Sequence, residues 1–146
     1  MTAIDIERKL DVLMEADSLD NVATAAPVGP YTPAVIADSN RSIAFLSGQL
    51  PLDPESGEIS PSDVGGQTRV ALTNALALAK VHGASPKDVL KIVVYTTQLH
   101  MVDEINRNYI DVLGDARPAR TMVEVSKLPR NALVEIELTA SVPPRN

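Results

Sequence analysis

The stretch VLKIVVYTTQL, residues 89–99, decides the fold. It is rich in β-branched residues, and it carries apolar side chains at both odd and even positions. A strand with one buried face alternates apolar and polar residues, whereas a strand buried on both faces is apolar almost throughout. The stretch therefore predicts a central strand of a β-sheet.

Amphipathic helices are expected on either side of this strand. Residues 63–82 carry a broad apolar face and are followed by Gly83, a residue that often ends helices. Residues 103–113 place Ile105 and Tyr109 at helical spacing. Each helix can bury its apolar face only against another element, and the sheet supplies that surface.

Four further apolar runs predict the remaining strands, at residues 34–37, 42–50, 120–125 and 133–140. The turn-forming residues 38–41 separate the first two runs, which predicts a β-hairpin. The expected order is ββ-α-β-α-ββ. It predicts an α+β fold in which a mixed β-sheet has two helices packed on one face.

The first 22 residues differ in character from the rest. They hold six acidic and two basic residues, a net charge of −4 out of −6 for the chain. Residues 4–16 have the spacing of an amphipathic helix, and the breaker-rich residues 17–33 follow. We expect residues 1–22 to be an acidic helical N-terminal extension and residues 23–146 to form a single domain.

Composition excludes several kinds of chemistry. The 146 residues include no Cys, so disulfides, thiol nucleophiles and thiolate metal sites are ruled out. Only two His are present, which argues against a zinc site. The glycines form neither a phosphate-binding loop nor a dinucleotide motif. No metal and no cofactor are expected.

Charge and hydropathy restrict the partners and the location. The net charge of −6 and the pI near 4.8 argue against a nucleic-acid partner, which needs a basic surface. No apolar run approaches the roughly 20 residues of a membrane-spanning helix, and the N-terminus does not resemble a signal peptide. A cytoplasmic protein without a membrane partner is expected.

The two last predicted strands bring charged side chains together. Val134 and Ile136 share the apolar face of their strand, which leaves Glu135 and Glu137 on the opposite face. If apolar positions face the helices, Arg120 lies with these acids on the side away from them. The arrangement fits a solvated salt bridge, and it also fits a pocket in which Arg120 binds a carboxylate and a glutamate activates water. Spacing leaves both interpretations open.

Other candidates are weaker on their own. Ser47 and Gly48 end a predicted strand, where Gly allows a ligand to approach the backbone, although a simple bulge gives the same pattern. Tyr31 lies in a loop after Gly29-Pro30 and fits a packing role, and Asn106 fits a surface amide of a helix.

Taken together, the motifs resemble those of the reactive intermediate deaminases, the RidA/YjgF family. The resemblance covers roughly residues 24–141. The matching segments, in chain order, are Ala26-Pro27, Gly29-Pro30-Tyr31, Leu46-Ser47-Gly48-Gln49-Leu50-Pro51, Gln67-Thr68, Asn74, Asn106, Tyr109, Arg117-Pro118-Ala119-Arg120-Thr121-Met122-Val123-Glu124-Val125, Leu128-Pro129 and Val134-Glu135-Ile136-Glu137.

The resemblance implies a chorismate-mutase-like (YjgF-like) α+β fold and a homotrimer with sites between subunits. It implies hydrolysis of 2-imino and 2-enamino acids, such as 2-aminoacrylate and 2-iminobutanoate, to 2-keto acids and ammonia. In that scheme Arg120 holds the substrate carboxylate and Glu135 places or activates the attacking water. The substrate-binding residues are Tyr31, Ser47, Gly48, Asn106 and the backbone at Met122.

Two departures keep alternative functions open. Many family members carry Cys where this chain has Met122, and the acidic N-terminal segment is additional to the common family core. A non-catalytic or regulatory module that binds small carboxylates is therefore a second hypothesis. A third is the endoribonuclease or translation-inhibitor activity attached to parts of the family, against which the acidic pI argues.

Overall fold

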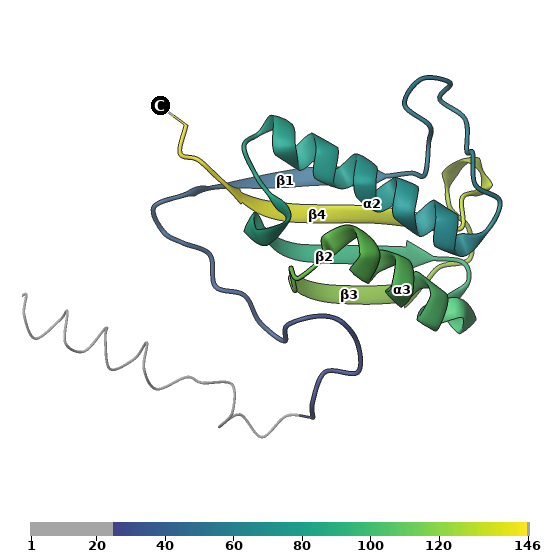
Figure 1. Ribbon diagram of the computed structural model, residues 1–146, viewed down its shortest axis with the longest axis horizontal. Helices are drawn as coiled ribbons and strands as arrows, with labels where there is room; N and C mark the ends of the chain where they lie inside the picture. Colours follow the sequence, from purple (N-terminus) through teal and green to yellow (C-terminus); the bar gives the residue numbers. More distant parts are fainter. Residues whose placement is uncertain (1–24, 146) are drawn as a thin grey trace, which may run out of the picture.

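The computed structural model describes residues 25–145. Four strands form one sheet in the order β1-β4-β2-β3, and two long helices accompany it (Figure 1). The strands and helices, with short 3-10 turns marked η, are β1 (Ser42–Gln49), α2 (Val64–Val81), η2 (Pro86–Asp88), β2 (Val89–Thr96), η3 (Leu99–Met101), α3 (Val102–Leu113), β3 (Ala119–Glu124), η4 (Pro129–Asn131) and β4 (Val134–Val142).

The sheet is mixed, as the sequence predicts. β4 pairs antiparallel with both β1 and β2, and β2 pairs parallel with β3. β2 is the strand expected at residues 89–99, and it has neighbours on both edges. Its residue Ile92 pairs with Leu138 of β4 and with Arg120 of β3, so these three side chains lie on the same face of the sheet.

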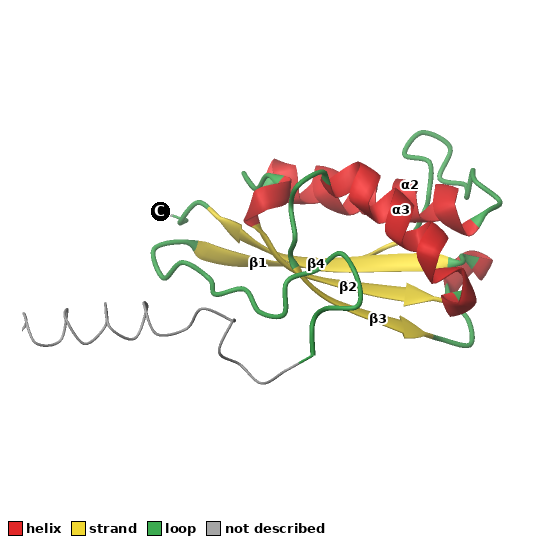
Figure 2. Ribbon diagram, turned by 60° about the horizontal axis from the view of Figure 1, so that its bottom comes forward, coloured by secondary structure: helices red, strands yellow, loops and turns green. Residues whose placement is uncertain are grey.

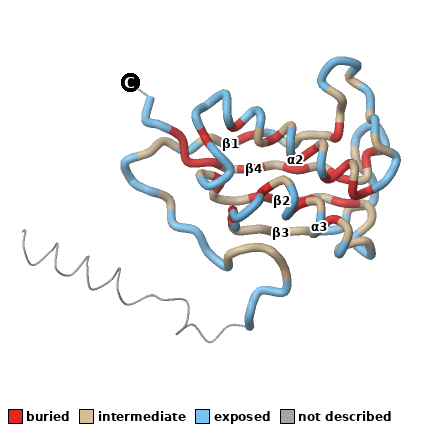
Figure 3. The backbone as a smooth tube through the Cα atoms, viewed as in Figure 1, coloured by how far each residue is buried: buried red, intermediate tan, exposed pale blue. Residues whose placement is uncertain are grey.

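Both helices cover one face of the sheet (Figure 2), which confirms the predicted layer arrangement. The core lies between the two layers (Figure 3). Leu72 from α2, Ile105 from α3, and Ile92 and Ile136 from the sheet are fully buried there. The opposite face of the sheet has no covering element among residues 25–145, and we call it the open face.

The predicted strand at residues 34–37 is wrong, and the β-hairpin with it. These residues are irregular, and Ile36 is 94% exposed. The turn at residues 38–41 does form, because the Asp38 carboxylate and carbonyl accept bonds from the backbone N–H groups of Asn40 and Arg41. A strand requires a neighbour that accepts its backbone hydrogen bonds, and within the described residues no strand pairs with residues 34–37.

The described order is therefore β-α-β-α-β-β, and the α+β class is unchanged. The predicted helix at residues 4–16, with the rest of the N-terminal extension, lies outside the described residues.

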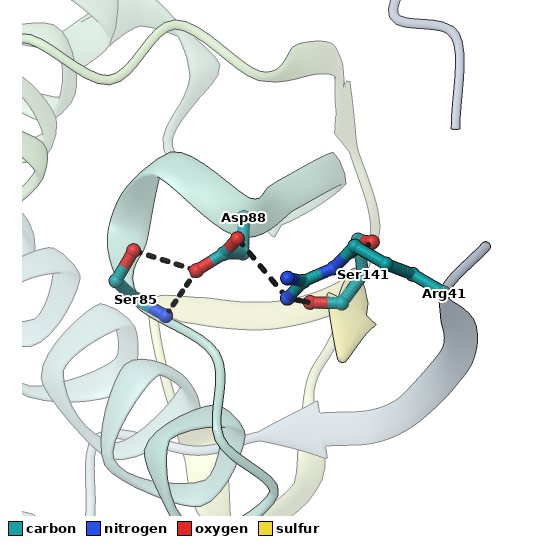
Figure 4. Close-up of polar contacts among 4 residues, drawn as sticks. All are labelled: Arg41, Ser85, Asp88 and Ser141. Atoms are coloured by element: carbon teal, nitrogen blue, oxygen red, sulfur yellow. Dashed lines mark hydrogen bonds and ion pairs between the residues drawn. The ribbon is translucent and has the colours of Figure 1, made fainter. Parts of the chain in front are cut away.

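A polar cluster ties one end of the β1–β4 pair, where β1 begins and β4 ends, to η2 (Figure 4). The Arg41 guanidinium donates from Nε to Ser141 Oγ at 2.8 Å and from NH2 to the Ser141 carbonyl at 3.0 Å. The same NH2 lies 3.2 Å from Asp88 Oδ1. Asp88 Oδ2 accepts bonds from the Ser85 hydroxyl at 2.7 Å and the Ser85 N–H at 2.8 Å.

These bonds predict that Asp88 makes stability depend on pH. The Ser85 hydroxyl and N–H, and then Arg41, lower the pKa of Asp88 below its ordinary value. A carboxylate with a lowered folded pKa stabilises the fold fully above its unfolded pKa of about 3.9, and this contribution is lost as pH falls through the folded pKa. We expect Asp88→Asn to cost about 0.5–1 kcal/mol at pH 7, because the group is partly exposed.

Urea unfolding of the parent and of Asp88→Asn, followed from pH 7 to pH 2, measures this dependence. The difference in the free energy of unfolding should shrink steadily below pH 4. A difference that stays constant across this range would contradict the assignment.

Candidate functional site

Arg120 lies on the helix side of the sheet, not on the open face. It pairs with the fully buried Ile92, and its neighbour at the next alternate position, Met122, packs against the core. The predicted orientation is therefore wrong for Arg120, whereas Glu135 and Glu137 do lie on the open face. β3 is an edge strand beside the end of the helical layer, so its helix side is only partly covered and accepts a charged side chain.

Helix α3 provides the principal contacts of Arg120. The guanidinium NH1 donates to Asn106 Oδ1 at 2.7 Å. The Arg120 Cζ atom lies 5.0 Å from the ring centroid of Tyr109 and 5.3 Å from that of Tyr31. Asn106 and Tyr109 stand three residues apart on α3, so the helix presents both to β3. We call Tyr31, Asn106, Tyr109 and Arg120 the arginine cluster.

The loop before β1 closes one side of the arginine cluster. The Thr32 N–H donates to the Pro118 carbonyl at 3.3 Å, which attaches the loop beside β3. A Cβ atom at Gly29 would lie 2.6 Å from Arg120 NH2 and 3.3 Å from the Tyr31 ring. Gly29 thus lets the chain pass close to the guanidinium, and a side chain at this position would require the Arg120 guanidinium to move.

Among residues 25–145, no carboxylate pairs with the partly buried positive charge of Arg120. The ion pairs within residues 25–145 are formed by Arg41, Arg69 and Arg130. Burial lowers the pKa of Arg120, while the phenols of Tyr109 and Tyr31 oppose that shift. Arginine nevertheless stays protonated in proteins, and one Asn106 oxygen satisfies only one of its five N–H donors. An anion bound here would supply the negative charge and the hydrogen-bond acceptors that residues 25–145 do not offer to Arg120.

Glu135 belongs to a second cluster, on the open face. It lies on β4 opposite Tyr95 of β2. A Cβ atom at Gly48 would lie 2.9 Å from Glu135 Cδ, so the missing side chain of Gly48 makes room for the carboxylate. The irregularity in β1 between Leu46 and Gln49 contains Gly48 and the exposed Ser47. We call Ser47, Gly48 and Glu135 the glutamate cluster.

The site residues predicted from the sequence therefore lie in two separate clusters of the folded chain. Tyr31 and Asn106 meet Arg120, with Met122 two residues further along the same side of β3. Ser47 and Gly48 accompany Glu135, and the sheet separates the two clusters.

Two members of the surroundings were missed as site residues. Tyr109 was expected to pack in the core, and Gly29 was noted only as part of a motif. The three-residue spacing of Asn106 and Tyr109 on one helix is the signal that associates Tyr109 with the site.

Two other features of residues 25–145 are relevant to function. Within this range, no three acidic or His side chains come together in a way that could hold a metal ion. No helix in this part of the chain is long and apolar enough to cross a membrane.

Within residues 25–145, the α+β fold places an arginine between two aromatic rings and without an acidic partner. Comparison with known proteins makes the assignment more specific. The model of the family described as Endoribonuclease L-PSP matches residues 22–142. The chain therefore belongs to this family, the RidA/YjgF family, and its fold is the chorismate-mutase-like α+β fold.

Individual relatives are similar over most of their length. A RutC family protein of Pyrococcus horikoshii is 40% identical over 114 residues, which are 78% of this chain and 88% of the relative. TdcF of Escherichia coli, by name a reactive intermediate deaminase, is 35% identical over 77% of this chain and 87% of its own.

Solved structures agree with these sequence matches. The structure of E. coli TdcF with bound serine has a TM-score of 0.64 and 36% identity, covering 81% of this chain and 92% of its own. RidA from the Antarctic bacterium Psychrobacter has a TM-score of 0.65 and 33% identity, covering 82% and 94%.

Proposed function

We propose that the protein hydrolyses reactive 2-imino and 2-enamino acids, of the 2-iminobutanoate and 2-aminoacrylate type, to 2-keto acids and ammonia. The observation that carries the proposal is Arg120, a partly buried cation with free N–H donors and no carboxylate partner among the described residues. These substrates share a carboxylate beside the reacting carbon, and guanidinium N–H groups bind a carboxylate in a two-pronged geometry. The name of the relative TdcF supports the same reaction class.

The reaction needs positioning and proton transfer. Arg120 holds the carboxylate and so fixes the imine carbon relative to water. Water adds to the carbon of the protonated imine while the Glu135 carboxylate takes one of its protons, which gives a neutral tetrahedral carbinolamine. Glu135 passes that proton to the nitrogen, the C–N bond breaks, and ammonia leaves while the hydroxyl gives its proton to Glu135 and becomes the keto oxygen. An enamine is first protonated on carbon to give the imine.

The separation of the two clusters supports a site shared by two subunits. Arg120 and Glu135 lie on opposite faces of one sheet, so a single chain cannot place both beside one small substrate. A second copy can present its glutamate cluster to the arginine cluster of the first. We propose that three copies close this contact into a homotrimer, in which the open face with its exposed Phe45 and Ile43 is covered by a neighbour.

The test generates the imine in place. An amino-acid oxidase oxidises a 2-amino acid in the presence and absence of the protein, and the release of ammonia and keto acid is followed. We expect the protein to accelerate release above the spontaneous rate. Equal rates with and without the protein, over a range of protein concentrations, would contradict the proposal.

A second function is favoured by Met122. This partly buried apolar side chain lies on the same side of β3 as Arg120, at a position where many family members carry Cys. A module that binds keto acids without turnover would retain the arginine cluster and lack the rate effect. Calorimetry showing tight 2-ketobutanoate binding, together with no acceleration in the oxidase assay, would select this function over hydrolysis.

A further inference from the structure

Tyr109 is the one member of the arginine cluster that is almost completely buried, with 1% of its surface exposed. Its ring lies against the Arg120 guanidinium with 5.0 Å between Cζ and the centroid. Tyr31 makes a similar contact at 5.3 Å but belongs to the partly exposed loop before β1. The ring of Tyr109 is therefore fixed by the core, whereas that of Tyr31 is held by a loop.

The fixed ring of Tyr109 restrains the orientation of the guanidinium plane, which the hydrogen bond to Asn106 alone does not do. The bond from NH1 to Asn106 Oδ1 anchors one nitrogen and leaves the guanidinium plane free to turn about that contact. A two-pronged carboxylate contact needs two N–H groups in one defined plane. An aromatic ring attracts a guanidinium to its face, and this attraction strengthens when both groups are shielded from water.

The hydroxyl of Tyr109 does not account for its presence. It is buried without a hydrogen-bond partner among the described residues, which is an unfavourable state for a polar group. Burial raises the pKa of Tyr109, against the opposing influence of Arg120 and Arg117, so the side chain stays neutral. The contact with Arg120 is consequently one between a cation and a ring, and not an ion pair with a phenolate.

We propose that Tyr109 is a positioning residue whose ring holds the Arg120 guanidinium in the plane required for binding the substrate carboxylate. The inference deepens the proposed function and rests on it, because it gives Arg120 a carboxylate to bind. Tyr109 acts through Arg120 and is not itself expected to touch the substrate.

Two substitutions separate the ring from the hydroxyl. Tyr109→Phe keeps the ring and should stay within about 3-fold of the parent KM, whereas Tyr109→Leu should raise KM about 10-fold or more with kcat within about 3-fold. Leu113→Ala is the matched control, because Leu113 is buried one turn further along α3. It should lower the melting temperature and leave KM within about 2-fold of the parent.

Coupling to Arg120 is tested by calorimetry with 2-ketobutanoate. Tyr109→Leu should weaken binding about 10-fold in the parent and have no further effect in an Arg120→Ala background. An equal loss in both backgrounds would show that Tyr109 acts independently of Arg120 and would overturn the proposal. A Tyr109→Phe variant as impaired as Tyr109→Leu would do the same, since the hydroxyl would then be the important group.

A measurement on the protein without substrate tests the role of the Tyr109 ring separately from the proposed function. In NMR spectra of arginine-labelled protein, the Arg120 Nε–H resonance is assigned by its loss in Arg120→Lys. The ring of Tyr109 should move the chemical shift of this resonance away from the usual arginine value. We expect this displacement to persist in Tyr109→Phe and to disappear in Tyr109→Leu. If the parent neither binds nor deaminates these acids but shows this pattern, the proposed function fails while the role of the ring stands. An unchanged resonance in Tyr109→Leu would overturn the role of the ring.

Discussion

Replacing Arg120 by alanine is expected to lower kcat/KM for 2-iminobutanoate by a factor of about 10³. The variant loses the cation that binds the substrate carboxylate, and with it the orientation of the imine carbon toward water. Binding of the product keto acid should also weaken about 100-fold, because its carboxylate loses the cation; Asn106 then keeps an unpaired amide oxygen in a partly buried place. Steady-state kinetics in the oxidase assay and calorimetry with 2-ketobutanoate measure both effects.

Two further variants show whether charge or geometry is responsible. Arg120→Lys keeps the positive charge but loses the planar donor pair, and we expect it to recover no more than about a tenth of the parent kcat/KM. Arg69→Ala is the matched control, since Arg69 bonds to Asn108 and Asp111 on exposed helix surfaces. It should leave the kinetics unchanged. An Arg120→Ala variant as fast as the parent would show that this mechanism is wrong.

Replacing Glu135 by glutamine is expected to lower kcat by a factor of about 10² to 10⁴, with a small change in KM. The amide fills the same space beside Gly48 but cannot take a proton from water at neutral pH. Glu137→Gln is the control, because Glu137 lies on the same strand and face two residues away. Its effect should be much smaller. Comparable losses in both variants would point to the charge of the open face and not to a proton carrier.

Mixing two inactive variants tests whether the site is shared between subunits. Arg120→Ala and Glu135→Gln chains are unfolded together in equal amounts and refolded. If each site takes Arg120 from one chain and Glu135 from its neighbour, random assembly should restore about a quarter of the parent sites. A site built within one chain restores none, and that outcome would contradict the shared site.

Local sequence patterns were sufficient for much of the fold. The stretch at residues 89–99 predicted a central strand, and β2 does lie between β4 and β3. The helical layer buries only one face of β2, with Ile92 and Val94, and on the open face Val93 and Tyr95 are half-buried. The helical spacing of Ile105 and Tyr109 predicted α3 and its buried face. The run at residues 34–37 has the same apolar character as a strand, but a strand exists only where a partner accepts its hydrogen bonds.

The candidate site depended more heavily on tertiary structure. Alternation along residues 120–125 separates Arg120 and Met122 from Thr121 and Val123, but it does not say which set faces the helices. The rule that the more apolar set faces the core fails on β3, because an edge strand is only partly covered by α3. Its helix side therefore holds a cation beside Asn106.

By itself, the sequence determined the α+β class, the two helices, the central strand and the residue types needed to bind an anion. These features follow from periodicity and side-chain chemistry, which are local properties of the chain. Only the tertiary structure decided that Arg120 and Glu135 lie on opposite faces of the sheet and that a tyrosine ring supports the guanidinium. The reason is that the face of an edge strand and the neighbours of a side chain depend on how distant elements pack, which no local pattern records.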